Sequence, residues 1–186
     1  MVASTAAECA EIESVVGGAA RLAQHTGSRA VERFTAPQIR KFWKDDPAGY
    51  EASERIHLVS SYMASLLIGA NAPLDPGDAS GMNLMDLRTS QWWTPAVEAC
   101  APDLARRLPA IVPPSTVIGT LAPHWQMRHG LPPARVLVWT GDNPSSLIGA
   151  GLIDEGQIGI SLGTSDTIFG PMREPRVSTS GDGHVF

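Results

Sequence analysis

Cysteine and long apolar runs are both scarce in this sequence of 186 residues. The two cysteines, Cys9 and Cys100, lie far apart, and neither belongs to a Cys-x-x-Cys or other metal-type spacing. We therefore expect free thiols in a reducing compartment rather than a disulfide framework or a zinc site. The longest apolar stretch, residues 63–70, suits a buried helix and is far shorter than a membrane span.

Basic clusters, a secretory leader, internal repeats and low-complexity tracts are also lacking. Lysine and arginine are scattered and the formal net charge is −5, which argues against nucleic acid as a partner. The first residues contain Glu8 and Glu11 and no basic start followed by an apolar stretch, so we expect a cytoplasmic protein. With 43% hydrophobic and 18% charged residues, the composition is that of one globular domain or parts of two.

Helical and strand patterns alternate along the chain, which predicts an α/β protein. Thr5 with Glu8 forms a capping-box pattern at the first helix, and Gly27 ends the second. The patterns predict helices over residues 5–16, 19–25, 35–47, 48–55, 60–69, 92–108, 123–129 and 143–151, with Asn143 capping the last, and strands over 56–59, 82–86, 117–119 and 135–139. The rhythm changes at residues 151–156, where we expect a second domain to begin.

One strand end carries residues suited to phosphoryl transfer. Asp142 and Asn143 follow the apolar run 136–139, and a carboxylate at a strand's carboxyl end lies where α/β active sites form. Such a carboxylate can accept the proton of an alcohol, and the asparagine can orient a sugar hydroxyl. Gly-Asp-Asn-Pro is also ordinary turn chemistry, and spacing alone favours that simpler interpretation.

A second polar strand end follows the apolar run 158–161 and contains Gly163, Thr164 and Ser165. Glycine lets the backbone approach an anion, and neighbouring hydroxyl and N–H groups can coordinate phosphate oxygens. The tripeptide is neither a Walker loop nor a dinucleotide fingerprint, and by itself it is better interpreted as a plain β-turn.

Taken together, several segments resemble the FGGY carbohydrate kinases, and most closely their eukaryotic-type xylulokinase branch. The polar strand ends are Gly141 to Leu147 and Ser161 to Thr167, separated by Asp-Glu-Gly at residues 154–156. Upstream, Thr-Gly-Ser-Arg-Ala and Glu-Arg-Phe-Thr begin at residues 26 and 32, Glu-Arg-Ile-His-Leu-Val-Ser-Ser at residue 54, and Ser-Gly-Met-Asn-Leu-Met-Asp at residue 80. These segments follow the family's order and cover essentially the whole chain.

The resemblance implies an α/β fold of the actin-like, ribonuclease H-like ATPase type, present here in part. Residues 1–152 would be the later part of an N-terminal sugar-binding domain, and residues 153–186 the opening strands of a C-terminal ATP-binding domain. The implied reaction is the phosphorylation of D-xylulose by ATP, with Mg²⁺, to D-xylulose 5-phosphate. The family's roles, carried over by position, make Asp142 the catalytic base for the C5 hydroxyl, Arg33, Asp142 and Asn143 the sugar contacts, and Gly163, Thr164 and Ser165 the turn that binds the ATP phosphates.

Some of the family's features have no counterpart in residues 1–186: a first phosphate turn with its aspartate, an upstream sugar-contacting histidine and a late adenosine motif. We therefore expect an internal segment that does not turn over substrate by itself. Two alternatives stay open, another FGGY sugar or polyol kinase and a non-catalytic remnant. His57 and His124 are predicted to pack or cap, and Asp78 and Asp86 to order loops and strand ends.

Overall fold

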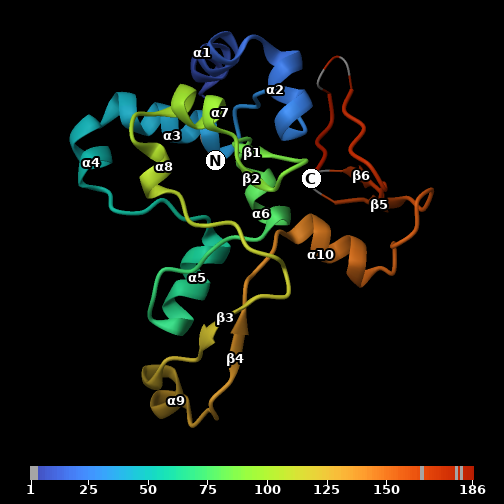
Figure 1. Ribbon diagram of the computed structural model, residues 1–186. Helices are drawn as coiled ribbons and strands as arrows, with labels where there is room; N and C mark the ends of the chain where they lie inside the picture. The colour runs from blue at the N-terminus through green and yellow to red at the C-terminus, as the bar shows by residue number, and fades with distance from the viewer. Residues whose placement is uncertain (1–3, 164–165, 179, 181) are drawn as a thin grey trace.

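The computed structural model describes residues 4–163, 166–178, 180 and 182–186. Its first part is a group of helices packed over a short hairpin (Figure 1). Their bounds are α1 Ala6–Val16, α2 Ala19–Thr26, α3 Thr35–Asp45, α4 Pro47–Ala52, α7 Thr94–Cys100 and α8 Leu104–Arg107, with β1 Met85–Asp86 and β2 Gln91–Trp92 as the hairpin.

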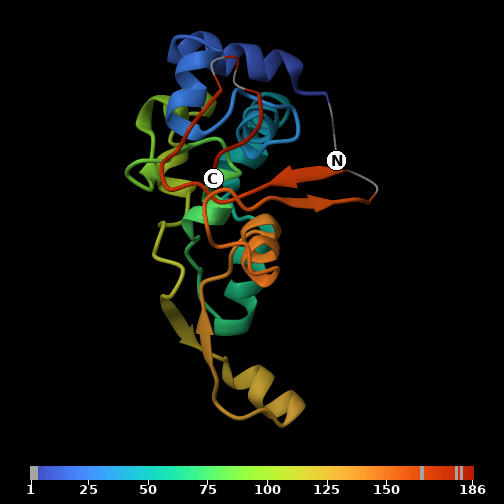
Figure 2. The ribbon, with the colours of Figure 1, turned by 90° about the vertical axis from the view of Figure 1, so that its right-hand side faces the viewer.

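The other elements lie outside this helical group, except that α6 packs against β1 and contributes Ala79 to the core. Figures 1 and 2 both show the β3–β4 hairpin and α9 projecting at one end, and β5 and β6 lying beside the helical group. These elements are α5 Val59–Ile68, α6 Pro76–Ser80, β3 Val117–Thr120, α9 Pro123–His129, β4 Arg135–Leu137, α10 Asp142–Gly149, β5 Gly159–Ser161 and β6 Thr167–Phe169.

The described strands pair as three separate two-stranded antiparallel sheets: β1 with β2, β3 with β4, and β5 with β6. In the β5–β6 sheet, Gly159 lies opposite Phe169 and Ser161 opposite Thr167. The predicted alternation of helices and strands is present. One isolated parallel bridge, between Leu74 and Ile111, ties the middle of the chain to the segment after α8.

The core lies within the helical group because the helices direct one apolar face inward. Ile12 of α1, Leu22 of α2 and Leu104 of α8 are almost completely buried. Tyr50 of α4 is fully buried as well, and its hydroxyl donates a hydrogen bond to the Pro102 carbonyl at 2.8 Å. Burying side chains of this size contributes about 1.5–3 kcal/mol each, so this cluster is the main source of stability for the helical group.

Local signals located helix ends more reliably than helix starts. Gly27 ends α2 in the left-handed conformation, as predicted, and its N–H bonds to the Ala23 carbonyl. The predicted capping box is wrong, because Thr5 donates its hydroxyl to the Glu32 carbonyl at 2.7 Å and Glu8 pairs with Lys44 at 2.8 Å. Both side chains therefore bond to residues distant in sequence and do not cap the helix.

Four other predictions of secondary structure need correction. The strand expected over residues 82–86 is confined to Met85–Asp86, because residues 81–83 form a turn. Residues 56–58 do not form a strand, because they pair with no other strand among the described residues. They lead directly into α5. Residues 92–108 divide into the end of β2, α7 and α8, with Pro102 and a left-handed Asp103 between the helices. Asn143 lies inside α10 and does not cap it, because the cap position is Gly141.

Both cysteines are free and buried, as expected. Burial raises the pKa of Cys9 to about 11 and that of Cys100 to about 12, so both remain thiols near neutral pH. Within the described residues, no helix has the length and apolar character needed to cross a membrane.

Candidate active site

Asp142 lies at the first position of α10, where the chain coming from β4 turns into the helix. Its side chain is exposed, and no hydrogen bond or ion pair reaches its carboxylate in the described parts of the chain. The helix start is secured by Ser145, whose N–H and hydroxyl both donate to the Gly141 carbonyl, at 3.3 and 2.8 Å. The Asp142 carboxylate is therefore left free to accept a proton from a ligand.

The loop that carries Asp142 lies directly against α6. A Cβ atom built on Gly77 would be 2.7 Å from Thr140 Oγ1 and 3.1 Å from Pro144 Cγ. From the other side, a Cβ on Gly141 would be 3.6 Å from Asp78 Oδ1 and 3.7 Å from the Gly77 carbonyl oxygen. The close approach at Gly77 leaves no room for a side chain, so the two segments hold each other in place.

Asp78 gives the Asp142 loop an acidic neighbour. Burial raises the pKa of Asp78, and the nearby charges of Asp75 and Asp142 raise it further, while a hydrogen bond from the Ser60 hydroxyl opposes the change. Asp75 caps α6 by accepting from the Asp78 N–H at 2.9 Å. Asp78 was predicted to order a loop, but it lies in α6, and its bond to Ser60 joins this helix to α5. Its proximity to Asp142 adds an electrostatic link that the sequence did not indicate.

Arg33 lies in the loop between α2 and α3, next to Phe34. Its side chain is exposed, and in the part of the chain that the structure describes it forms no ion pair. The guanidinium carbon is 5.5 Å from the centre of the Phe34 ring, and Phe34 itself is buried at the start of α3. An exposed cation on a fixed aromatic ring can donate hydrogen bonds to a polar ligand.

Residues 75–83 connect the surroundings of Arg33 with those of Asp142. At one end, α6 touches the Asp142 loop through Gly77. At the other end, the Met82 carbonyl accepts from the Ala36 N–H at 3.1 Å, and Asn83 donates to Thr26 Oγ1 at 2.6 Å. One segment thus supports both predicted sugar-binding regions, although no interaction among the described residues joins Arg33 to Asp142 directly.

The predicted phosphate turn is described at Gly163 only, because Thr164 and Ser165 lie outside the described residues. Gly163 follows β5, and its N–H donates to the Asp166 carboxylate at 3.2 Å. This amide is already engaged by an anionic side chain, so a phosphate oxygen would have to displace the Asp166 carboxylate to reach it. In the described chain, no hydrogen bond or ion pair joins Gly163 to Asp142.

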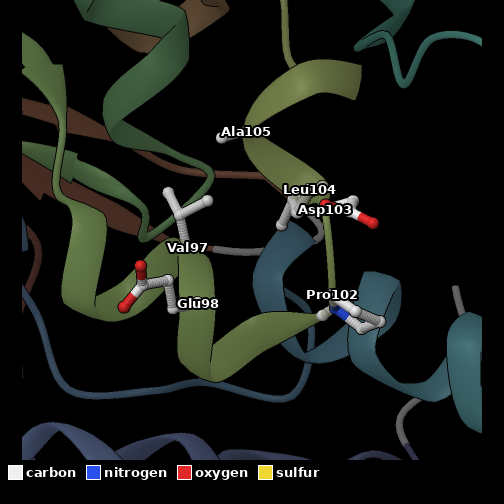
Figure 3. A pocket seen from close by; sticks show the side chains of 7 residues that line it. Val97, Glu98, Pro102, Asp103, Leu104 and Ala105 are labelled. Atoms are coloured by element: carbon white, nitrogen blue, oxygen red, sulfur yellow. The ribbon is translucent and has the colours of Figure 1, made fainter.

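Two cavities lie away from these residues. One, of about 250 Å³, lies between α7 and α8, and the carboxylates of Glu98 and Asp103 on its wall point in different directions (Figure 3). The other, of about 410 Å³, is lined by residues 55 and 57–59 and by Tyr62. Neither is lined by a predicted catalytic or sugar-binding residue.

Four polar residues outside the candidate site have structural partners. His57 bonds to Ser61 Oγ at 3.0 Å, and the His124 ring packs edge-on against the ring of Trp125, with centroids 5.0 Å apart, as predicted. Asp86 accepts from the N–H groups of the turn that follows it, which confirms its role at a strand end. It also pairs with His25 Nδ1 at 2.6 Å, a contact that the sequence did not indicate.

Comparison with known proteins supports the resemblance. The family model described as "FGGY family of carbohydrate kinases, N-terminal domain" matches residues 2–149. The xylulose kinase of Rattus norvegicus is 45% identical over 187 residues, which cover 100% of this chain and 34% of that protein. Xylulose kinase 2 of Arabidopsis thaliana is 47% identical over 186 residues, which cover 100% of this chain and 33% of that protein. The chain therefore spans about a third of the length of these curated relatives.

Solved structures confirm the expected fold class. A gluconate kinase from Lactobacillus acidophilus superposes with a TM-score of 0.82 at 20% sequence identity. The match covers 95% of this chain and 37% of the gluconate kinase chain. A xylulose kinase from Rhodospirillum rubrum has a TM-score of 0.76 at 22% identity, covering 88% of this chain and 33% of its own. At this level of sequence identity, the similarity shows a shared fold and nothing further. The match of the family model over most of the sequence goes further, and this chain belongs to the FGGY family of carbohydrate kinases.

Proposed function

We propose that this chain forms the sugar-binding part, and one phosphate-binding turn, of an ATP-dependent kinase that converts D-xylulose to D-xylulose 5-phosphate in the cytoplasm. The observation that carries the proposal is the exposed carboxylate of Asp142 at the start of α10, which has no partner among the described residues and whose loop packs against α6. The sequence match to xylulose kinases over the whole chain supports the choice of sugar.

Asp142 would act as the general base. Phosphoryl transfer to an alcohol needs mainly alignment, charge neutralisation and an acceptor for the hydroxyl proton. A carboxylate that is already engaged in an ion pair would be a poor acceptor, and Asp142 has no such partner within the described residues. Asn143, the next residue of α10, is also exposed and would orient the sugar through its amide.

Arg33 would hold the sugar from the side of α3. Its guanidinium offers five N–H donors, and Phe34 limits the directions in which the side chain can extend. Because residues 75–83 contact both the start of α3 and the Asp142 loop, a sugar bound to Arg33 could be presented to Asp142 by a single rigid support.

The turn at Gly163, Thr164 and Ser165 would hold phosphate oxygens of ATP, and the Gly163 N–H would exchange its bond to Asp166 for one to a phosphate oxygen. ATP would supply the phosphoryl group, and Mg²⁺ on its phosphates would neutralise their charge. The proposed division into a sugar-binding part, residues 1–152, and the beginning of an ATP-binding part, residues 153–186, agrees with the end of the family match at residue 149.

The proposal can be tested with a chimera in which this chain replaces the matched third of the rat xylulose kinase. ADP release should depend on D-xylulose and be much weaker with D-ribulose, gluconate or glycerol. A preference for one of those compounds would favour a different FGGY kinase. An inactive chimera that is folded and still binds ATP would favour a non-catalytic remnant.

A further inference from the structure

The last residues of the chain return to the helical group beside the candidate sugar site. After β6 the chain turns back toward α2 and the β1–β2 hairpin, as both views show (Figures 1 and 2). The Val185 N–H donates to the Gly27 carbonyl at 3.0 Å. The Asp182 carboxylate forms an ion pair with the Arg29 guanidinium, with Oδ1 and Nη2 3.7 Å apart. We call residues 182–186 the C-terminal strap.

The strap places the His184 imidazole on Phe34, the ring that also carries Arg33. The centres of the His184 and Phe34 rings are 5.1 Å apart. The Phe186 ring packs edge-on against His184, with ring centres 5.4 Å apart. Arg33 lies over the same Phe34 ring at 5.5 Å. A guanidinium and an imidazole that are far apart in sequence therefore share one aromatic support.

His184 and Arg33 have complementary free groups. The Nε2 atom of His184 is buried and lacks a hydrogen-bond partner among the described residues. Burial lowers the pKa of His184 and the nearby Arg33 charge lowers it further, whereas the Ser80 backbone opposes both. The imidazole is thus kept neutral, so one of its nitrogens is a hydrogen-bond acceptor, and an arginine side chain can only donate.

We propose that His184 is a positioning residue of the sugar site: when the sugar binds, the Arg33 guanidinium turns on Phe34 and donates a hydrogen bond to the free Nε2 atom of His184, which fixes the direction in which Arg33 meets the sugar. The inference rests on the proposed function, because it assumes that Arg33 binds the sugar. It adds a residue from beyond the phosphate turn, so that the two ends of the described chain together define one binding site.

The test compares three substitutions of His184 in the same chimera. His184→Phe keeps a ring on Phe34 but removes the acceptor, and it should raise KM for D-xylulose roughly tenfold while KM for ATP stays unchanged. His184→Gln carries a polar group close to the position of Nε2 and should stay within about threefold of the unmodified protein. His184→Asn carries one close to Nδ1 instead and should resemble His184→Phe. His124→Phe, in α9, is the control for the loss of an imidazole elsewhere.

Coupling to Arg33 separates positioning from general stability. With Arg33→Ala already present, His184→Phe should change KM for D-xylulose less than twofold, because the group that it positions is gone. The inference is overturned if His184→Phe leaves KM for D-xylulose unchanged, if KM for ATP rises equally, or if Asn restores the site and Gln does not. If the unmodified chimera shows no xylulose-dependent turnover, the proposed function fails. The same variants are then compared by calorimetric binding of D-xylulose to the 186-residue chain.

Discussion

Replacing Gly27 by alanine should destabilise the protein far more than the same change at another helix-ending glycine. Gly27 has φ 89°, where an L residue is strained by about 1–2 kcal/mol. In addition, a Cβ atom at this position would be 2.0 Å from the Val185 carbonyl oxygen, which is backbone and cannot rotate away. The C-terminal strap must therefore move.

The cost of moving the strap can be worked out from its contacts. The hydrogen bond from Val185 to Gly27 contributes about 0.5–1.5 kcal/mol, and the packing of His184 on Phe34 about as much again. Gly130 is the matched control, since it also ends a helix in the left-handed conformation, at φ 63°, and has no atom within 4 Å of an added Cβ. Gly27→Ala should thus cost roughly 1–3 kcal/mol more than Gly130→Ala.

Thermal and urea unfolding of the 186-residue chain measure this difference. For a chain of this size, 1 kcal/mol corresponds to about 2–4 °C in Tm, so the two variants should differ by roughly 2–12 °C. In the chimera, Gly27→Ala should also raise KM for D-xylulose, because the strap carries His184. Equal losses of stability in the two variants would refute the reasoning, since they would show that the strap does not rest on Gly27 in solution.

Three further predictions concern the sugar site, an acid-sensitive pair and a buried thiol. Arg33→Ala in the chimera should raise KM for D-xylulose by the equivalent of about 1.5–3 kcal/mol and leave KM for ATP unchanged; an unchanged sugar affinity would reassign Arg33 to the fold. The pKa of Asp86 is lowered, since hydrogen bonds from His25 and the following turn outweigh the opposing effect of burial. This stabilisation is present above the unfolded-state pKa of about 3.9 and is lost as the pH falls through the folded value, so urea unfolding between pH 6 and pH 3 should show a steeper loss than in His25→Phe. Burial raises the pKa of Cys100 to about 12, and its thiol donates a hydrogen bond to the Ala36 carbonyl. Cys100 should therefore react with iodoacetamide at pH 8 only at the rate of unfolding. Rapid labelling of the native chain would contradict its burial.

The sequence predicted those features of the fold that neighbouring residues determine. The helix at Pro123–His129 was predicted to the residue, because proline is suited to a first turn and Gly130 to a helix end. The strand over residues 56–59 was wrong because a strand needs a partner, and pairing depends on residues elsewhere in the chain. The Thr5 cap failed for a similar reason, since Glu32 provides a competing acceptor.

The candidate site was predictable in part. The position of Asp142 after a strand follows from the local pattern and is what the structure has. The contacts that define its surroundings cannot be predicted from the local pattern, because Gly77 and Asp78 are more than sixty residues away from Asp142 in the sequence. His184 reaches Phe34 from the opposite end of the chain, and no periodicity or spacing reports such a contact.

The most direct test of the central claim is single-turnover phosphoryl transfer by the chimera carrying Asp142→Asn. The amide keeps the size of the side chain but cannot take the proton, so the rate should fall about 10²–10⁴-fold while the Kd for D-xylulose changes only a few-fold. Asp154→Asn, a change at another exposed carboxylate of the same chain, should leave the rate unchanged. A rate for Asp142→Asn close to that of the unmodified chimera would contradict the assignment of Asp142 as the catalytic base.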